Sequence, residues 1–388
     1  MFGELEKLLS KSDGTTQMVD KCIACVEKSS GVLVFGAGVG GAKLYELLSA
    51  RDLDSKIVAW IDNNELKWEK TYMNDSLEII KADEVTEKYG TECTIIVASS
   101  AYDLIVNQMS RLGYPKEKVV LYNFAFMDLD YTDASFIWDN IKNFERAYQR
   151  LCDDKSRKIF VDLLNYKITK DEKYLDMMHE YVDDEYYQYF DKEIYDKIDG
   201  EALLDVGAYI GDTLEVYETL YDDLHNIKYY GFEADPVVYA RLNEVVKNKY
   251  SEKQVYLYNL AAWNEDTVLW FEENAGSSRM KTNDTSAKNS IKAMPLDKVL
   301  TNDEITIIKM DIEGAELPAL NGLKAVIAKN KPIFAICVYH LRDDFFKVTD
   351  FIEEQLPGEY KFYFRQYRYT PTETVCYAVP RHRWIEEG

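Results

Sequence analysis

Short hydrophobic runs alternate with segments of helical spacing over the first third of the chain. After a helical stretch at residues 1–30, strands are expected at 31–35, 56–61, 94–98 and 119–121, with helices at 42–50 and 103–112. Strands that alternate with helices are typical of a parallel, doubly wound sheet. We therefore expect a first α/β domain over residues 1–129.

The strand pattern stops near residue 130 and returns near residue 200. The residues between them, 130–199, have helical spacing and are expected to form a helical connector. A second alternation follows, with strands at 202–206, 228–232, 255–259, 267–271, 305–310, 333–338, 361–367 and 374–379 and helices at 315–328 and 348–355. The expected fold class is α/β, with two Rossmann-like domains joined by the connector and the second over residues 200–388.

Composition limits the classes of partner. The chain has 388 residues, 47% hydrophobic and 30% charged, with a formal net charge of -23. This charge repels phosphate backbones and anionic membrane surfaces, so nucleic acid is not an expected partner. The N-terminus does not resemble a secretion signal, and the apolar runs are far shorter than the roughly 20 residues of a membrane helix, so we expect a cytoplasmic location without membrane insertion. Cys22 and Cys25 form a C-x-x-C without a second Cys or His pair nearby, which disfavours a metal or redox site.

A glycine turn joins the strand at 202–206 to the helix that follows it. The turn has a D-x-G-x-x-x-G arrangement, and its candidate ligand contacts are Asp205, Gly207, Ala208, Tyr209, Gly211, Asp212 and Thr213. Glycine at 207 and 211 permits a tight bend and a close approach of the backbone to a ligand. The amides that begin the next helix suit a carboxylate, such as the methionyl end of a cofactor.

The ends of the next two strands add further candidate contacts. These are Glu233, Ala234 and Asp235 after the first strand and Ala261 and Ala262 after the second. A carboxylate such as Glu233 can accept both ribose hydroxyls of a nucleoside cofactor. The two alanines either leave room for an adenine or allow close packing. Because the turn is D-x-G-x-x-x-G rather than G-x-G-x-x-G, the combination favours S-adenosyl-L-methionine as the cofactor.

Candidate catalytic residues follow two later strands. Asp311, Glu313 and Glu316 follow one, and His340 follows the other. Burying acids at a strand end without a purpose would be costly, although Glu316 could instead complement the dipole of the next helix. Asp311, Glu313 and His340 are candidate bases for a hydroxyl, and the alternative is that the same three side chains hold a divalent metal. The polar stretch 274–290 is expected to be a mobile loop that covers the acceptor.

Two of these segments, Leu204–Thr213 and Lys309–Glu316, together resemble the FkbM family of methyltransferases. The Tyr189-Phe190 pair also resembles what precedes the first strand in that family. The similarity covers about residues 200–380. It implies a class I methyltransferase fold, with a seven-stranded mixed sheet whose last strand is antiparallel. It also implies O-methylation of a small hydroxylated acceptor, such as a sugar or a nucleotide sugar.

The first domain carries a second glycine motif. Gly36, Gly38 and Gly41 match G-x-G-x-x-G between a strand and a helix, and Asp62 ends the next strand. Alone, this pattern indicates dinucleotide binding, but the domain is about half the size of a full dinucleotide fold. A nucleotide or nucleotide-sugar site, a scaffold or dimerisation role in a homo-oligomer, and NAD chemistry all stay open. The rivals to a methyltransferase are therefore an NAD(P)-dependent oxidoreductase and a non-catalytic nucleotide-binding module.

Overall fold

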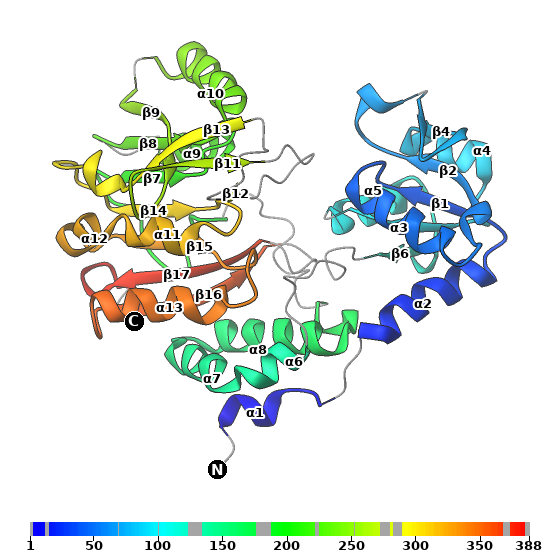
Figure 1. Ribbon diagram of the computed structural model, residues 1–388, viewed down its shortest axis with the longest axis horizontal. Coiled ribbons are helices and arrows are strands. Elements are labelled where there is room, and N and C mark those ends of the chain that lie inside the picture. Colours follow the sequence, from blue (N-terminus) through cyan, green and yellow to red (C-terminus); the bar gives the residue numbers. More distant parts are fainter. Residues whose placement is uncertain are drawn as a thin grey trace.

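Two large sheets organise the chain (Figure 1). The structure, a computed structural model, describes residues 3–11, 15–68, 70–99, 101–122, 134–175, 188–221, 225–251, 253–271, 280–281, 289–367 and 373–384. The α/β class and the two Rossmann-like sheets predicted from the sequence are confirmed. In these ranges, none of the helices has the length and apolar character needed to cross a membrane.

The first sheet has six strands in the order β3-β4-β2-β1-β5-β6, parallel except for the edge strand β3. The strands are β1 (Val32–Phe35), β2 (Ile57–Ile61), β3 (Thr71–Tyr72), β4 (Asn74–Ile80), β5 (Thr94–Val97) and β6 (Val119–Leu121). The helices are α2 (Thr15–Lys28), α3 (Val39–Ser49), α4 (Val85–Tyr89) and α5 (Tyr102–Arg111). Alternate residues of β1 enter different cores: Val34 packs in the cluster that contains Leu44 of α3, and Leu33 in the one that contains Met109 of α5.

The region expected to be a helical connector is helical in its first part, whereas its described residues 188–199 form turns and irregular structure. It contains α6 (Ala134–Asp139), α7 (Ile141–Arg150) and α8 (Asp154–Thr169). The expected helix at 1–30 is two helices, since α1 (Glu4–Leu8) is separate from α2 and packs against α7. The amides of Glu4 and Leu5 each donate to the Glu145 carboxylate of α7 at 3.0 Å, which fixes α1 there.

The second sheet has seven strands in the order β16-β17-β15-β14-β7-β8-β9. The strands are β7 (Ala202–Val206), β8 (Lys228–Glu233), β9 (Val255–Asn259), β14 (Ile307–Met310), β15 (Ile333–Cys337), β16 (Tyr360–Gln366) and β17 (Thr374–Pro380). The last strand, β17, lies between β15 and β16 and is antiparallel to both, while the other neighbours pair in parallel. The mixed sheet with an antiparallel last strand is thus confirmed.

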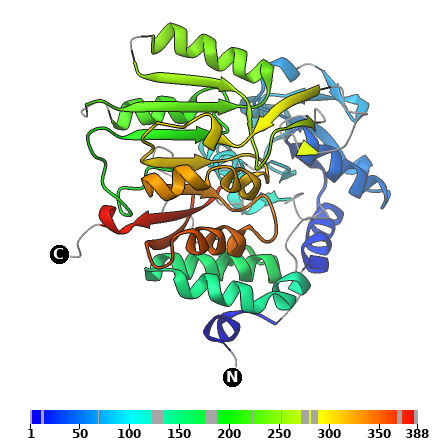
Figure 2. The same cartoon turned by 60° about the vertical axis from the view of Figure 1, so that its left-hand side comes forward.

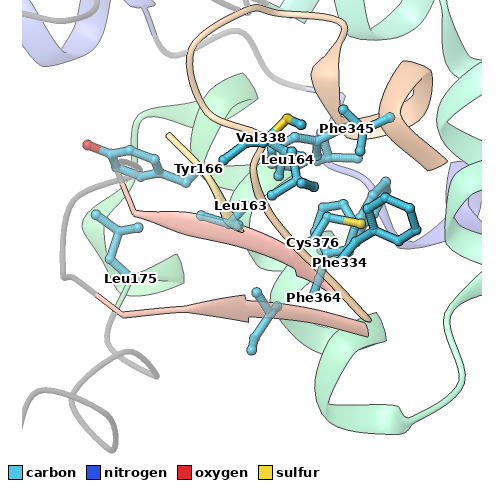
Figure 3. Packing of buried hydrophobic residues seen from close by; sticks show 14 of the residues in the cluster. Leu163, Leu164, Tyr166, Leu175, Phe334, Val338, Phe345, Phe364 and Cys376 are labelled. Carbon is cyan, nitrogen blue, oxygen red and sulfur yellow. The ribbon is translucent and has the colours of Figure 1, made fainter. Parts of the chain in front are cut away.

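Helices cover both faces of this second sheet. They are α9 (Asp212–Leu220), α10 (Pro236–Lys249), α11 (Glu316–Asn321), α12 (Lys324–Asn330) and α13 (Asp344–Gln355). On one face, α7 packs on α13 and α8 packs on β16, so the connector helices extend this layer (Figure 2). Figure 3 shows Leu163 and Leu164 of α8 among Phe345 of α13, Phe364 of β16 and Cys376 of β17.

Three local expectations need correction. The expected strand at 267–271 exists as β11 (Thr267–Phe271) but belongs to a small third sheet with β10 (Ala261–Ala262), β12 (Met280–Lys281) and β13 (Asn289–Met294). Consequently, residues 280–281 and 289–290 of the expected loop at 274–290 are strand, and its other residues lie outside the described ranges. The expected helix at 315–328 is split into α11 and α12 near Gly322, where a Cβ would lie 2.1 Å from the Trp263 carbonyl oxygen.

Candidate active site

The glycine turn after β7 lies directly against the loop that follows β14, because β7 and β14 are neighbours in the sheet. Gly207 has φ +89°, and a Cβ there would lie 2.1 Å from the carbonyl oxygen of Asp311. Gly211, with φ +91°, is the N-cap of α9, so no side chain of the capping residue covers the first amides of that helix. Tyr209 between them has φ +45° and is 56% exposed. The turn therefore presents backbone and one aromatic ring at this edge.

Asp205 lies beneath the turn and is 0% exposed. Its carboxylate lies 2.9 Å from the Lys309 ammonium and accepts a hydrogen bond from the Tyr229 hydroxyl at 2.6 Å. Lys309 also donates to the Gly207 carbonyl at 2.8 Å. Burial raises the pKa of Asp205; burial alone would lower the pKa of Lys309, but the carboxylates of Asp205 and Asp311 raise it. Asp205 was expected to bind the cofactor, but its burial limits it to holding the turn in place.

Glu233, at the end of β8, faces the turn from the neighbouring strand. One carboxylate oxygen accepts the Tyr209 amide at 2.9 Å, and the other accepts the Asp235 amide at 2.8 Å. Burial raises the pKa of Glu233. A carboxylate has about four acceptor positions, so two remain for ribose hydroxyls. The Asp235 side chain instead caps α10, accepting the amides of Val237 and Val238 at 2.7 and 3.1 Å.

The remaining small cofactor candidates differ in exposure. Ala208, Ala261 and Ala262 are 0%, 2% and 4% exposed, and Thr213 is 6% exposed. Ala261 packs in the core of the small sheet, which favours the packing interpretation of the alanine pair. Ala234 also packs, partly buried, against that core, and Asp212 is exposed at the start of α9.

Asp311, after β14, is held by two tyrosine hydroxyls. Its Oδ2 accepts the Tyr189 hydroxyl at 3.1 Å, and its Oδ1 accepts the Tyr339 hydroxyl at 3.2 Å. The Nε2 atom of His340 lies 3.3 Å from Oδ1. The side chain is still 27% exposed. Tyr189 has φ +74°, a strained conformation for a residue with a side chain.

His340 is surrounded by carboxylates. Its Nδ1 lies 2.9 Å from Glu316 Oε1, and its Nε2 lies 3.9 Å from Glu313 Oε2 in addition to the Asp311 contact. Burial alone would lower the pKa of His340, but Glu316, Asp311 and Glu313 raise it to about 9. At neutral pH the ring is therefore protonated, which disfavours the role of base. Glu313 is 44% exposed, and burial of the rest of its side chain raises its pKa.

The metal alternative lacks support in the described residues. Across those ranges, no group of three or more His, Cys, Asp and Glu side chains is placed to hold a metal ion. The contacts of His340 with Asp311 and Glu316 are instead those of an ion pair.

In the first domain, burial raises the pKa of the Cys22 thiol to about 12, so the C-x-x-C carries an unreactive thiol at neutral pH.

Side chains of the first domain hydrogen-bond to its glycine motif. Asp62 accepts the Ala37 amide at 2.9 Å and the Lys67 ammonium at 2.8 Å. Lys67 also donates to the Ala37 carbonyl, and the Tyr72 hydroxyl donates to the Gly38 carbonyl at 2.7 Å. Gly36 has φ +113°, and a Cβ at Gly41 would lie 2.2 Å from its carbonyl oxygen, so the motif forms a tight turn. The Asp62 carboxylate, which would bind ribose in a dinucleotide site, is thus already paired.

Sequence reasoning missed several residues that hold the site. Lys309 lies in an otherwise apolar strand, and this position is the only feature of the sequence that indicates a buried lysine with a charged partner. Tyr229 and Tyr339 gave no distinguishing signal, because tyrosine is common in this chain, with 30 residues.

Comparisons with known proteins find a matching family model in each half of the chain. Residues 205–370 match the family model described as the methyltransferase FkbM domain, and residues 28–120 match the model described as C2185-like, N-terminal. The crystal structure of methyltransferase FkbM from Methylobacillus flagellatus KT is similar with a TM-score of 0.61 and 20% identity, covering 94% of this chain and 100% of that one. This similarity extends the shared fold across almost the whole chain.

Two further structures match more weakly. A putative rRNA-methylase from Clostridium thermocellum has a TM-score of 0.33 and 12% identity, covering 55% of this chain and 97% of that one. Aeropyrum pernix fibrillarin, with natively bound S-adenosyl-L-methionine, has a TM-score of 0.29 and 12% identity, covering 47% of this chain and 67% of that one. At these TM-scores neither carries an argument about this chain. A comparison with curated proteins gives no significant match.

Proposed function

Because residues 205–370 match the family model of the methyltransferase FkbM domain, as the motifs predicted, we propose that this chain transfers a methyl group from S-adenosyl-L-methionine to a hydroxyl. The acceptor is a small metabolite, such as a sugar or a nucleotide sugar. A cytoplasmic location and a homo-oligomeric state stay predictions from the sequence.

One observation carries this proposal. The glycine turn after β7 and the backbone of Asp311 lie against each other, since a Cβ at Gly207 would lie 2.1 Å from the backbone carbonyl oxygen of Asp311. A cofactor on the turn would therefore lie beside a proton acceptor. The carboxyl ends of strands in open α/β sheets are where ligands bind.

The residues around the turn fit the cofactor. Glu233 keeps acceptor positions for ribose hydroxyls after binding the amides of Tyr209 and Asp235. The first amides of α9 suit the methionyl carboxylate, and the exposed Tyr209 ring offers a surface for apolar contact. When bound, the cofactor supplies a methyl group on a positively charged sulfur and so provides the leaving group.

The chain supplies alignment and a proton acceptor. Asp311 accepts the proton of the acceptor hydroxyl, and the Tyr189 and Tyr339 hydroxyls fix its carboxylate. Because His340 is protonated at neutral pH, it stabilises the charged carboxylate and leaves the role of base to Asp311. Glu313 lies on the same side of the His340 ring as Asp311, with its Oε2 atom 3.9 Å from His340 Nε2.

The test is transfer of labelled methyl groups to a panel of sugars, nucleotide sugars and other hydroxylated metabolites. We expect Asp311→Asn to reduce turnover about 100- to 10,000-fold, the usual contribution of a general base, with cofactor affinity retained. Asp266→Asn is the matched control, because Asp266 is an exposed acid paired with Lys298 in the same half of the chain. Unchanged turnover in Asp311→Asn would overturn the assignment of Asp311 as the base. Oxidation of a substrate with NAD(P) in place of methylation would overturn the proposed function.

A further inference from the structure

A buried carboxylate stands behind His340, on the side away from Asp311. Glu316 begins α11 and is 0% exposed. Its Oε1 accepts the Ile312 amide at 3.0 Å and lies 2.9 Å from Nδ1 of His340. The other ring nitrogen of His340 lies 3.3 Å from Asp311 Oδ1. The three side chains therefore form a line from the interior to the proposed base.

We propose that Glu316 is a positioning residue, which fixes the ring of His340 so that its Nε2–H points at Asp311. This inference rests on the proposed function, since it assigns Asp311 the role of base. A carboxylate behind a histidine fixes the orientation of the ring and stabilises its protonated form. Glu316 thereby reaches the reacting hydroxyl only through His340 and Asp311.

Interaction with the dipole of helix α11 does not by itself account for a buried carboxylate at Glu316. The helix α11 has 6 residues, and the Ile312 amide uses only Oε1. The Oε2 atom is buried without a hydrogen-bond partner in the described part of the chain. Burying a carboxylate is costly unless it is paired, and the charged partner in contact with it is His340.

The charge on His340 depends on acids from three elements. Glu316 comes from α11, Asp311 and Glu313 from the loop after β14, and Asp344 from the start of α13. Burial, with a smaller effect from the Glu316 carboxylate in the same direction, raises the pKa of Asp344 to about 8. Among these acids, Glu316 is the one whose carboxylate contacts the inner ring nitrogen of His340.

The experiment follows the His340 resonances of the full-length protein by NMR during a pH titration, with His340→Gln used for assignment. In the unmodified protein the pKa of His340 should be about 9. In Glu316→Gln it should fall toward the ordinary value of about 6.5. At pH 7.5, kcat should fall about 10- to 100-fold, as on loss of an outer partner of a site residue. Cofactor affinity should stay within about twofold, and the loss of activity as the pH rises should begin at a lower pH than in the unmodified protein.

Glu201→Gln is the matched control, because Glu201 is also 0% exposed and pairs with Arg383 far from His340 in sequence. It should lower stability without changing the pKa of His340. An unchanged pKa of His340 in Glu316→Gln, or an equal loss of cofactor affinity and kcat, would overturn the inference. If Glu316→Gln does not fold, a near-ordinary pKa of His340 in the unmodified protein overturns it equally. The NMR titration needs no turnover, so its outcome is separate from that of the proposed function.

Discussion

Replacement of Gly207 by alanine tests whether the glycine turn and Asp311 form one rigid unit. At φ +89° a side chain costs about 1–2 kcal/mol. The new Cβ would also lie 2.1 Å from the Asp311 carbonyl oxygen, a backbone atom that cannot rotate away. Relief of such overpacking costs a further ~1–3 kcal/mol. We therefore expect Gly207→Ala to lower the free energy of unfolding by about 2–5 kcal/mol.

The same clash should impair the site. To restore ordinary contact, the turn and the Asp311 backbone must separate by about 1 Å, and a displacement of that size can reduce catalysis about 100-fold. Unfolding in urea would give the stability, and labelled methyl transfer the activity. Gly200→Ala is the matched control, since Gly200 has φ +77° but no described atom lies within 4 Å of the position that its Cβ would take. Equal losses of stability in the two variants, or full activity of Gly207→Ala, would refute this reasoning.

Two further substitutions test the buried charges. Lys309→Met should lower the free energy of unfolding, measured by chemical denaturation, by about 3–5 kcal/mol, because it leaves the Asp205 carboxylate buried without its ion pair. A double variant that also carries Asp205→Asn should recover much of this loss. If it recovers none, the pairing is contradicted. As the pH rises from about 4 to about 8, the unmodified protein should lose stability relative to the Asp344→Asn variant. Burial raises the pKa of Asp344 to about 8, so the folded unmodified protein keeps a proton on this side chain that its unfolded state releases. Melting temperatures at pH 5 and pH 8.5 measure this, and a pH-independent difference between the two proteins would count against it.

The sequence was most informative where strands are buried. Runs such as 94–98 and 333–338 are continuous apolar segments, which parallel strands with two covered faces require. The strand β4 begins with Asn74 and Asp75, and β13 follows a long polar stretch, so neither shows that pattern. Their pairing depends on neighbours that only the folded chain brings together.

The candidate site was likewise predictable only in part from the sequence. Glycines and acids after strands β7, β8 and β14 were found because motif spacing places them at one sheet edge. Their partners depend on strand order: Lys309 meets Asp205 because these residues are paired in register between β14 and β7. Tyr189 reaches Asp311 from a segment that precedes the whole sheet, a contact with a sequence separation of 122 residues. Spacing along the chain carries no information about such contacts.

Titration of the purified protein with S-adenosyl-L-methionine by calorimetry tests the central claim most directly. NAD and a Glu233→Gln variant complete the experiment, because Glu233 is proposed to accept the ribose hydroxyls. We expect S-adenosyl-L-methionine to bind the unmodified protein at one site, with affinity reduced about 10-fold or more in the variant, which corresponds to about 1.4 kcal/mol or more. NAD binding without S-adenosyl-L-methionine binding would contradict the account and assign the cofactor to the turn at Gly36–Gly41.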